Sequence, residues 1–219
     1  MALKNNDYDN NSSLILVKIS QRDENDKKTD PHFVISRKVD DKWVQDTTTY
    51  KSISGDITRI DISEYEWEGI PQKSIKVYLK DSDAHELYGL TIKSGILGRD
   101  ILNKLITLES LNNVQIDLYT NKKGYANSAV RQNGEIVKWK FEFADLPKPL
   151  EITHPKTGAV ISRDYSELEE LFFNATKEFA EKFEIFGKSK NAGHASPTGV
   201  ASETPDEAEG KKEEVEEWD

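Results

Sequence analysis

The chain has 219 residues, contains no cysteine and has a single methionine, Met1. The absence of cysteine excludes disulfides, thiolate metal sites and cysteine nucleophiles, and it fits a reducing compartment. No apolar run approaches the ~18 residues of a transmembrane helix, and the polar start MALKNNDYDNN is not typical of a signal peptide. We therefore expect a cytoplasmic protein with no membrane segment.

Hydrophobic residues are also scarce, at 36% of the chain, whereas charged residues reach 32% and the net charge is −10. Residues 201–219 hold nine acidic and two basic side chains, a net of −7, which leaves −3 for residues 1–200. Residues 188–205 are small and polar, as in a flexible linker. Such a segment buries too little apolar surface to offset its ordering entropy, so we predict a disordered linker and acidic tail over 188–219.

Apolar and polar residues alternate through most of the rest of the chain, which predicts strands. Strands are expected at 50–67, 74–80, 86–93, 114–119, 125–132 and 135–143, with shorter extended runs at 14–20, 32–39 and 42–44. Helical spacing of apolar residues predicts helices at 96–111 and 166–186. Asn133-Gly134 is a strong type I′ hairpin signal.

Three strands, one helix and two strands follow one another between residues 50 and 132. This is the element order of the OB-fold, a five-stranded barrel that binds oligonucleotides or oligosaccharides. We therefore predict a mainly β protein with an OB-fold core over 50–143. An N-terminal β extension (1–49), a connector with a helix (144–187) and the tail (188–219) complete the expected organisation.

Three segments together resemble bacteriophage single-stranded DNA-binding proteins of the OB-fold type. They are Ser54-Gly55…Tyr65-Glu66-Trp67-Glu68-Gly69, Gly124-Tyr125…Val130-Arg131-Gln132-Asn133-Gly134…Lys138-Trp139-Lys140, and an acidic tail that ends in an aromatic-acid pair. The resemblance implies sequence-tolerant coating of single strands during replication and recombination, with the tail recruiting replication proteins. The tail residues that it implies as partner-binding are Glu213, Glu214, Glu216, Glu217, Trp218 and Asp219. The block 12–45, and a Trp one residue before the end where related tails often finish in Phe, depart from the pattern.

The strand over 74–80 carries the most specific candidate site. Its non-core face presents Lys76, Tyr78 and Lys80, and single-strand binders use such a mixture because rings stack on bases while amines follow the phosphates. The alternative is an ordinary solvent-facing strand, with lysine for solubility and tyrosine for β propensity.

Further candidate residues lie in loops and on neighbouring strands. The loop of Lys122, Lys123 and Tyr125 has the position at which OB loops close over a strand. Trp67 either stacks a base or covers an edge of the barrel. Trp139 is expected in the core because it alternates in phase with Val137 and Phe141, which turns Lys138 and Lys140 outward. Weaker nucleic-acid-binding candidates are Arg59, Lys93 and Arg131.

No catalytic, metal or cofactor motif is present. The four histidines are scattered, no phosphate-binding glycine loop or nucleophile elbow occurs, and Asp81-Ser82-Asp83 is better explained as a solvated turn. The leading hypothesis is a single-stranded DNA-binding protein without cofactor. The main alternative is an OB-like protein-interaction or virion-associated module, and an enzyme of nucleic-acid metabolism is the third. The phenylalanines of the last predicted helix recur at helical spacing. We expect them to pack on the rest of the fold, and a homodimer interface is the alternative.

Overall fold

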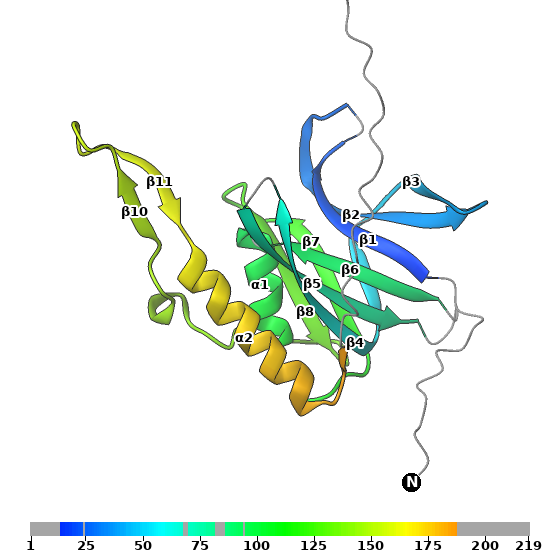
Figure 1. The fold of residues 1–219 in the computed structure, drawn as a ribbon. Helices are drawn as coiled ribbons and strands as arrows, with labels where there is room; N and C mark the ends of the chain where they lie inside the picture. Colours follow the sequence, from blue (N-terminus) through cyan, green and yellow to red (C-terminus); the bar gives the residue numbers. More distant parts are fainter. Residues whose placement is uncertain (1–13, 24, 68–69, 82–85, 94, 188–219) are drawn as a thin grey trace, which may run out of the picture. The chain divides into compact units, whose positions relative to one another are not determined.

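The computed structural model describes residues 14–23, 25–67, 70–81, 86–93 and 95–187 (Figure 1). Its strands are β1 (Leu14–Arg22), β2 (Lys28–Val39), β3 (Lys42–Tyr50), β4 (Ser52–Trp67), β5 (Ile70–Lys80), β6 (Leu87–Lys93), β7 (Val114–Thr120), β8 (Ala126–Gln132), β9 (Glu135–Ile136), β10 (Leu150–Thr153), β11 (Val160–Asp164) and β12 (Phe186–Gly187). The helices are α1 (Ile96–Leu105), the 3-10 turn η1 (Phe143–Asp145) and α2 (Ser166–Lys182).

The predicted elements between residues 50 and 132 are confirmed in type and in order. β4, β5 and β6 precede α1, and β7 and β8 follow it. Inward positions on these strands are the expected ones, since Val77, Leu79, Val114 and Ile116 are almost fully buried. The turn after β8 forms as predicted, with Asn133 at φ 52° and Gly134 at φ 85°.

The predicted five-stranded barrel is wrong. Within the described residues the main sheet has ten strands in the order β3-β2-β1-β6-β5-β4-β7-β8-β9, with β12 paired to β4. The free edge of β6 is taken by β1 in parallel, with Val17 opposite Leu90, so the N-terminal strands are part of the sheet. Ile15, Val17 and Phe33 carry the apolar surface that drives this association, and all three are buried in the common core.

The sheet bends within β4, at Gly55. Residues 52–55 pair with β7, whereas residues 56–67 pair with β5. Gly55 has φ +156°, and a Cβ there would lie 2.7 Å from the backbone oxygen of Lys80. Only glycine allows this approach without a shift. Beyond the bend β2 returns beside β7, where Thr120 Oγ1 donates to Asp30 Oδ1 over 2.6 Å.

α1 covers the inner face of the sheet but is shorter than predicted. Leu97, Ile101, Leu102 and Leu105 are buried, and the helix ends at Leu105 instead of residue 111. Thr107 Oγ1 bonds both the Lys104 oxygen (2.7 Å) and the Lys138 oxygen (2.9 Å). The Thr107 hydroxyl thus competes for the Lys104 carbonyl oxygen with the backbone amides that would continue the helix.

The predicted strand over 135–143 is wrong beyond Ile136. Residues 137–141 cross α1 as an irregular segment, because buried Asn103 supplies the partners of their backbone. Its Oδ1 accepts from the amides of Lys140 (3.1 Å) and Phe141 (2.9 Å), and its Nδ2 donates to the Phe141 oxygen. We call residues 137–141 the strap.

Trp139 of the strap is not a core residue, contrary to the prediction. Its side chain is 44% exposed, and its indole N–H donates to Asp100 Oδ1 over 2.9 Å. Asp100 also accepts from Lys104 Nζ at 2.7 Å and from Ser128 Oγ at 2.7 Å. The Asp100 and Lys104 side chains are only 11% and 10% exposed, so a satisfied buried ion pair joins α1, β8 and the strap.

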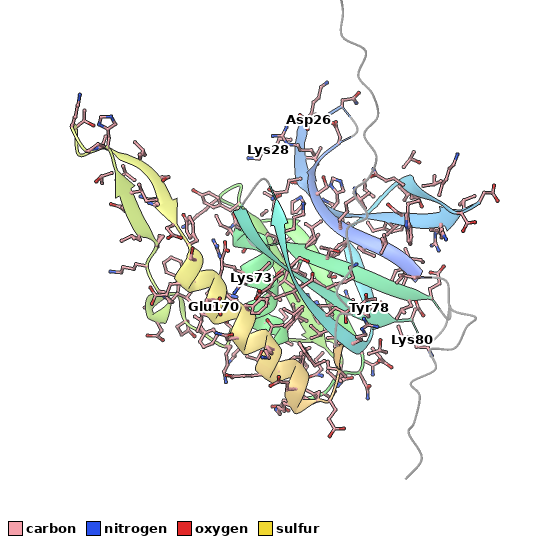
Figure 2. All side chains as sticks on the ribbon, viewed as in Figure 1. Asp26, Lys28, Lys73, Tyr78, Lys80 and Glu170 are labelled. Atoms are coloured by element: carbon pink, nitrogen blue, oxygen red, sulfur yellow. The ribbon has the colours of Figure 1, made fainter. Side chains whose placement is uncertain are left out.

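α2 begins at Ser166 as predicted and ends at Lys182, four residues early. Phe172 and Phe179 are buried, and Phe183 and Phe186 pack against the core, so the aromatic stripe faces the same chain. Figure 2 shows Lys73 of β5 reaching toward Glu170 of α2, with which it forms an ion pair. No helix within the described part of the chain is long and apolar enough to cross a membrane.

Candidate nucleic-acid interface

The outward face of the sheet carries a row of cations across three adjacent strands. Lys76 of β5 lies opposite Thr91 of β6, which in turn lies opposite Lys18 of β1. Because side chains alternate along strands, Tyr78 and Lys80 share this face with Lys76, and Lys93 shares it with Thr91. The predicted alternation of Lys76, Tyr78 and Lys80 opposite the core residues is therefore confirmed, and both helices pack on the other face.

Tyr78 is held in a local network. The Arg59 guanidinium lies 5.0 Å from the ring centroid, and the phenol donates to Asp61 Oδ2 over 3.0 Å. Arg59 in turn pairs with Asp61, whose side chain is 14% exposed. Across the strand the ring and the Lys76 stem cover Gly89, where a Cβ would lie 3.6 and 3.5 Å from them. The Tyr78 ring therefore has Arg59 as a neighbour within the fold.

A hollow of about 460 Å³ lies beside this row, where β6 runs into α1. The β1–β2 hairpin and the β7–β8 loop form its other walls. Lys18, Lys28 and Lys93 line it together with exposed Tyr125 and Ile96, and no acidic residue does. None of the three lysines takes part in an ion pair among the described residues. We call this site the basic hollow.

The walls of the basic hollow are fixed by local hydrogen bonds and by one close approach. Asn121 Oδ1 accepts from the amides of Lys123 (2.9 Å) and Tyr125 (3.0 Å), which orders the β7–β8 loop. Gly124 of this loop has φ +81°. At the other wall Gly98 brings α1 so close to β6 that a Cβ would collide with the Lys93 oxygen.

The basic hollow joins predicted residues to residues that the sequence did not indicate. Lys93 and Tyr125 were candidates, and Lys122 and Lys123 are exposed in the same loop. Lys18 and Lys28 were not candidates, because they belong to the N-terminal hairpin. In Figure 2, Lys28 lies at the end of that hairpin, whereas Tyr78 and Lys80 lie toward the opposite end of the sheet.

Other predicted residues are placed elsewhere. Lys138 and Lys140 lie on the strap, which is bonded to Asn103 of α1 and to Thr107 just after it, and neither lysine lines the basic hollow. Arg131 of β8 pairs with Asp117 of β7 at 3.1 Å. The side chain of Trp67 and the whole tail, residues 188–219, lie outside what the structure describes.

Asp117 gives a prediction for pH. Burial alone would raise the pKa of this carboxyl, but hydrogen bonds from Gln115, Ser52 and Arg131 outweigh it and hold the pKa below its ordinary value. A lowered pKa stabilises the fold above the unfolded-state value near ~3.9, and this stability is lost as the pH falls through the folded pKa. In thermal melts, Asp117→Asn should have a lower melting temperature than the parent at neutral pH. Its melting temperature should fall less than that of the parent when the pH drops below about 4. The control is Asp40→Asn, at an exposed aspartate. The prediction would be contradicted if Asp117→Asn melted like the parent at neutral pH and its melting temperature fell as steeply at acid pH as that of the control.

Comparisons of the chain with protein-family models, curated proteins and solved structures give no match. The described residues include no group of three or more histidine and carboxylate side chains that could hold a metal ion.

Proposed function

We propose that the protein binds single-stranded DNA without marked sequence preference. The observation that carries the proposal is the basic hollow. Three lysines that form no ion pair among the described residues line it together with an exposed tyrosine, and no carboxylate lines it. The sequence resemblance to phage single-stranded DNA-binding proteins agrees with this function, but the barrel that it implied is wrong. The proposal therefore rests on the side chains of the site.

The charge of the whole chain does not oppose this function. Seven of the ten net negative charges belong to residues 201–219. Phosphate binding requires only a local set of cations, and Lys18, Lys93 and Lys76 form such a set across β1, β6 and β5. The exposed Lys122 and Lys123 extend it over the β7–β8 loop.

Titration of a fluorescent oligo-dT at two salt concentrations tests the proposal. We expect binding that weakens with salt, with a slope of about 0.7 in log K against log salt for each phosphate contact. A duplex competitor of the same length should displace the oligonucleotide poorly. The absence of binding at low salt would overturn the proposal.

We also propose that the acidic tail recruits replication proteins. The compartment proposed for this is the cytoplasm, which is that of an infected host cell if the protein is phage-encoded. The chain leaves the described fold at Gly187, where β12 pairs with β4 beside Asp61 and Arg59. We propose that the nine acidic side chains of residues 201–219 compete with DNA phosphates for the lysines of the fold.

Removal of residues 201–219 should raise affinity for oligo-dT at low salt. The gain should fade near 1 M salt, where the Debye length is ~3 Å. Trp218→Ala should impair capture of a polymerase or helicase and leave DNA affinity unchanged. A truncated chain that binds DNA no better than the full chain would contradict the competition, and a purely solubilising tail would give that result.

A second candidate function is a protein-interaction or virion-associated module without nucleic-acid binding. The observation that favours it is the β10–β11 hairpin, a separate two-stranded sheet on which Leu150, Ile152, Val160 and Ile161 are all exposed. Figure 1 shows this hairpin projecting beyond α2. Such a surface fits a protein partner. Failure of every oligonucleotide to bind would favour this function.

A further inference from the structure

The basic hollow has an apolar side as well as a charged one. Tyr125 is 66% exposed and Ile96 is 80% exposed, and both line the same hollow as the three lysines. Phosphate binding alone would need only the amines. An aromatic ring and an aliphatic side chain at the rim offer a surface for a flat, uncharged group.

The size of the hollow suits a ligand larger than a phosphate ion. Its volume of about 460 Å³ falls within the ~300–1,000 Å³ that is typical of small-molecule sites. The cations come from three strands, Lys18 from β1, Lys28 from β2 and Lys93 from β6, and Tyr125 lies in the β7–β8 loop. A ligand with both a charged and a planar part therefore meets complementary groups.

We infer that the basic hollow holds one unstacked nucleotide of a single strand. Its base lies against the Tyr125 ring and Ile96, and its flanking phosphates lie on Lys18, Lys28 and Lys93. This inference rests on the proposed function. It adds a selection for single strands, because a base in a duplex is stacked and paired and cannot enter without the cost of extrusion.

A free nucleotide has the same chemistry as a nucleotide within a strand. The strand is favoured because the cations do not end at the hollow. Thr91 of β6 lines the hollow and lies opposite Lys76 of β5. Cations on the outward face therefore continue from the hollow to β5, the strand that also carries Tyr78. A mononucleotide would leave these positions unused.

The test compares short oligo-dT with an abasic oligomer of the same length and backbone, using the full-length protein. The parent should prefer oligo-dT, and Tyr125→Ala should weaken oligo-dT binding by about 5- to 150-fold while leaving binding of the abasic oligomer unchanged. Tyr125→Phe should behave like the parent, because stacking needs the ring and not the hydroxyl. Tyr119→Ala, at a tyrosine that is 45% exposed on β7 and does not line the hollow, is the matched control.

Three outcomes would overturn the inference. They are equal binding of both oligomers by the parent, an undiminished preference in Tyr125→Ala, and displacement of oligo-dT by thymidine monophosphate at concentrations near the oligonucleotide's own Kd. In the first two cases salt-sensitive binding of oligo-dT would still support the proposed function, so the two failures are distinguishable. Far-ultraviolet circular dichroism of each variant confirms that it is folded.

Discussion

Replacement of both Lys18 and Lys93 by glutamate is expected to weaken binding to oligo-dT on the order of 100-fold at about 0.1 M salt. Both side chains are exposed and line the basic hollow, on neighbouring strands. A contact with a slope of about 0.7 contributes roughly fivefold in affinity at 0.1 M relative to 1 M salt. Two lost contacts therefore give about 25-fold, and the two added negative charges repel the strand further.

The matched control for this variant reverses two lysines on the strap. Lys138 and Lys140 are exposed as well, but they belong to the strap and do not line the basic hollow. The Lys138→Glu, Lys140→Glu variant changes the net charge by the same amount and should lose only the long-range attraction, which salt screens. Equal losses in the two variants would show that net charge, and not the basic hollow, governs binding.

Replacement of Asp100 by alanine is expected to destabilise the fold by about 3–5 kcal/mol. The change leaves the Lys104 ammonium buried without its carboxylate and removes the acceptor of the Ser128 hydroxyl and of the Trp139 indole N–H. A buried charge without a partner costs far more than the pair itself contributes. Urea denaturation should show a lower midpoint at an unchanged slope.

Asp26→Asn is the control for this stability prediction, because Asp26 has φ 60° and asparagine, unlike alanine, tolerates this backbone conformation. Asp26 forms an ion pair with Arg22 at 2.8 Å, also four residues apart, but the two side chains are 81% and 63% exposed. Exposed pairs contribute about 0–1 kcal/mol. An Asp100→Ala variant as stable as Asp26→Asn would mean that the strap and α1 are not held together by this cluster.

The sequence predicts the local elements well and their partners poorly. The alternation of Ile75, Val77 and Leu79 determines both the strand and its buried face, because burial of apolar surface acts at every second residue. The parallel pairing of β1 with β6 joins Val17 to Leu90 across more than seventy residues. No local pattern signals such a contact, so the closed barrel is a natural but wrong expectation.

The residues of the basic hollow differ in the same way in how far the sequence predicts them. Lys93 and Tyr125 could be proposed because each lies beside a recognisable turn or strand end. Lys18 and Lys28 could not, since their role depends on where the hairpin docks. The strap differs from the predicted strand for another reason. Its alternation is real, but Asn103 and Asp100 on α1 provide side-chain partners that replace a strand neighbour.

Binding of a base in the basic hollow is measured most directly by photochemical cross-linking of a short oligonucleotide that carries 5-iododeoxyuridine, followed by mass spectrometry of the digested protein. Halogenated bases attach preferentially to aromatic side chains that they contact. We predict adducts at Tyr125, in the β7–β8 loop of the basic hollow, that disappear in Tyr125→Ala. Adducts confined to residues 131–143, or to the β10–β11 hairpin, with none at Tyr125, would contradict it.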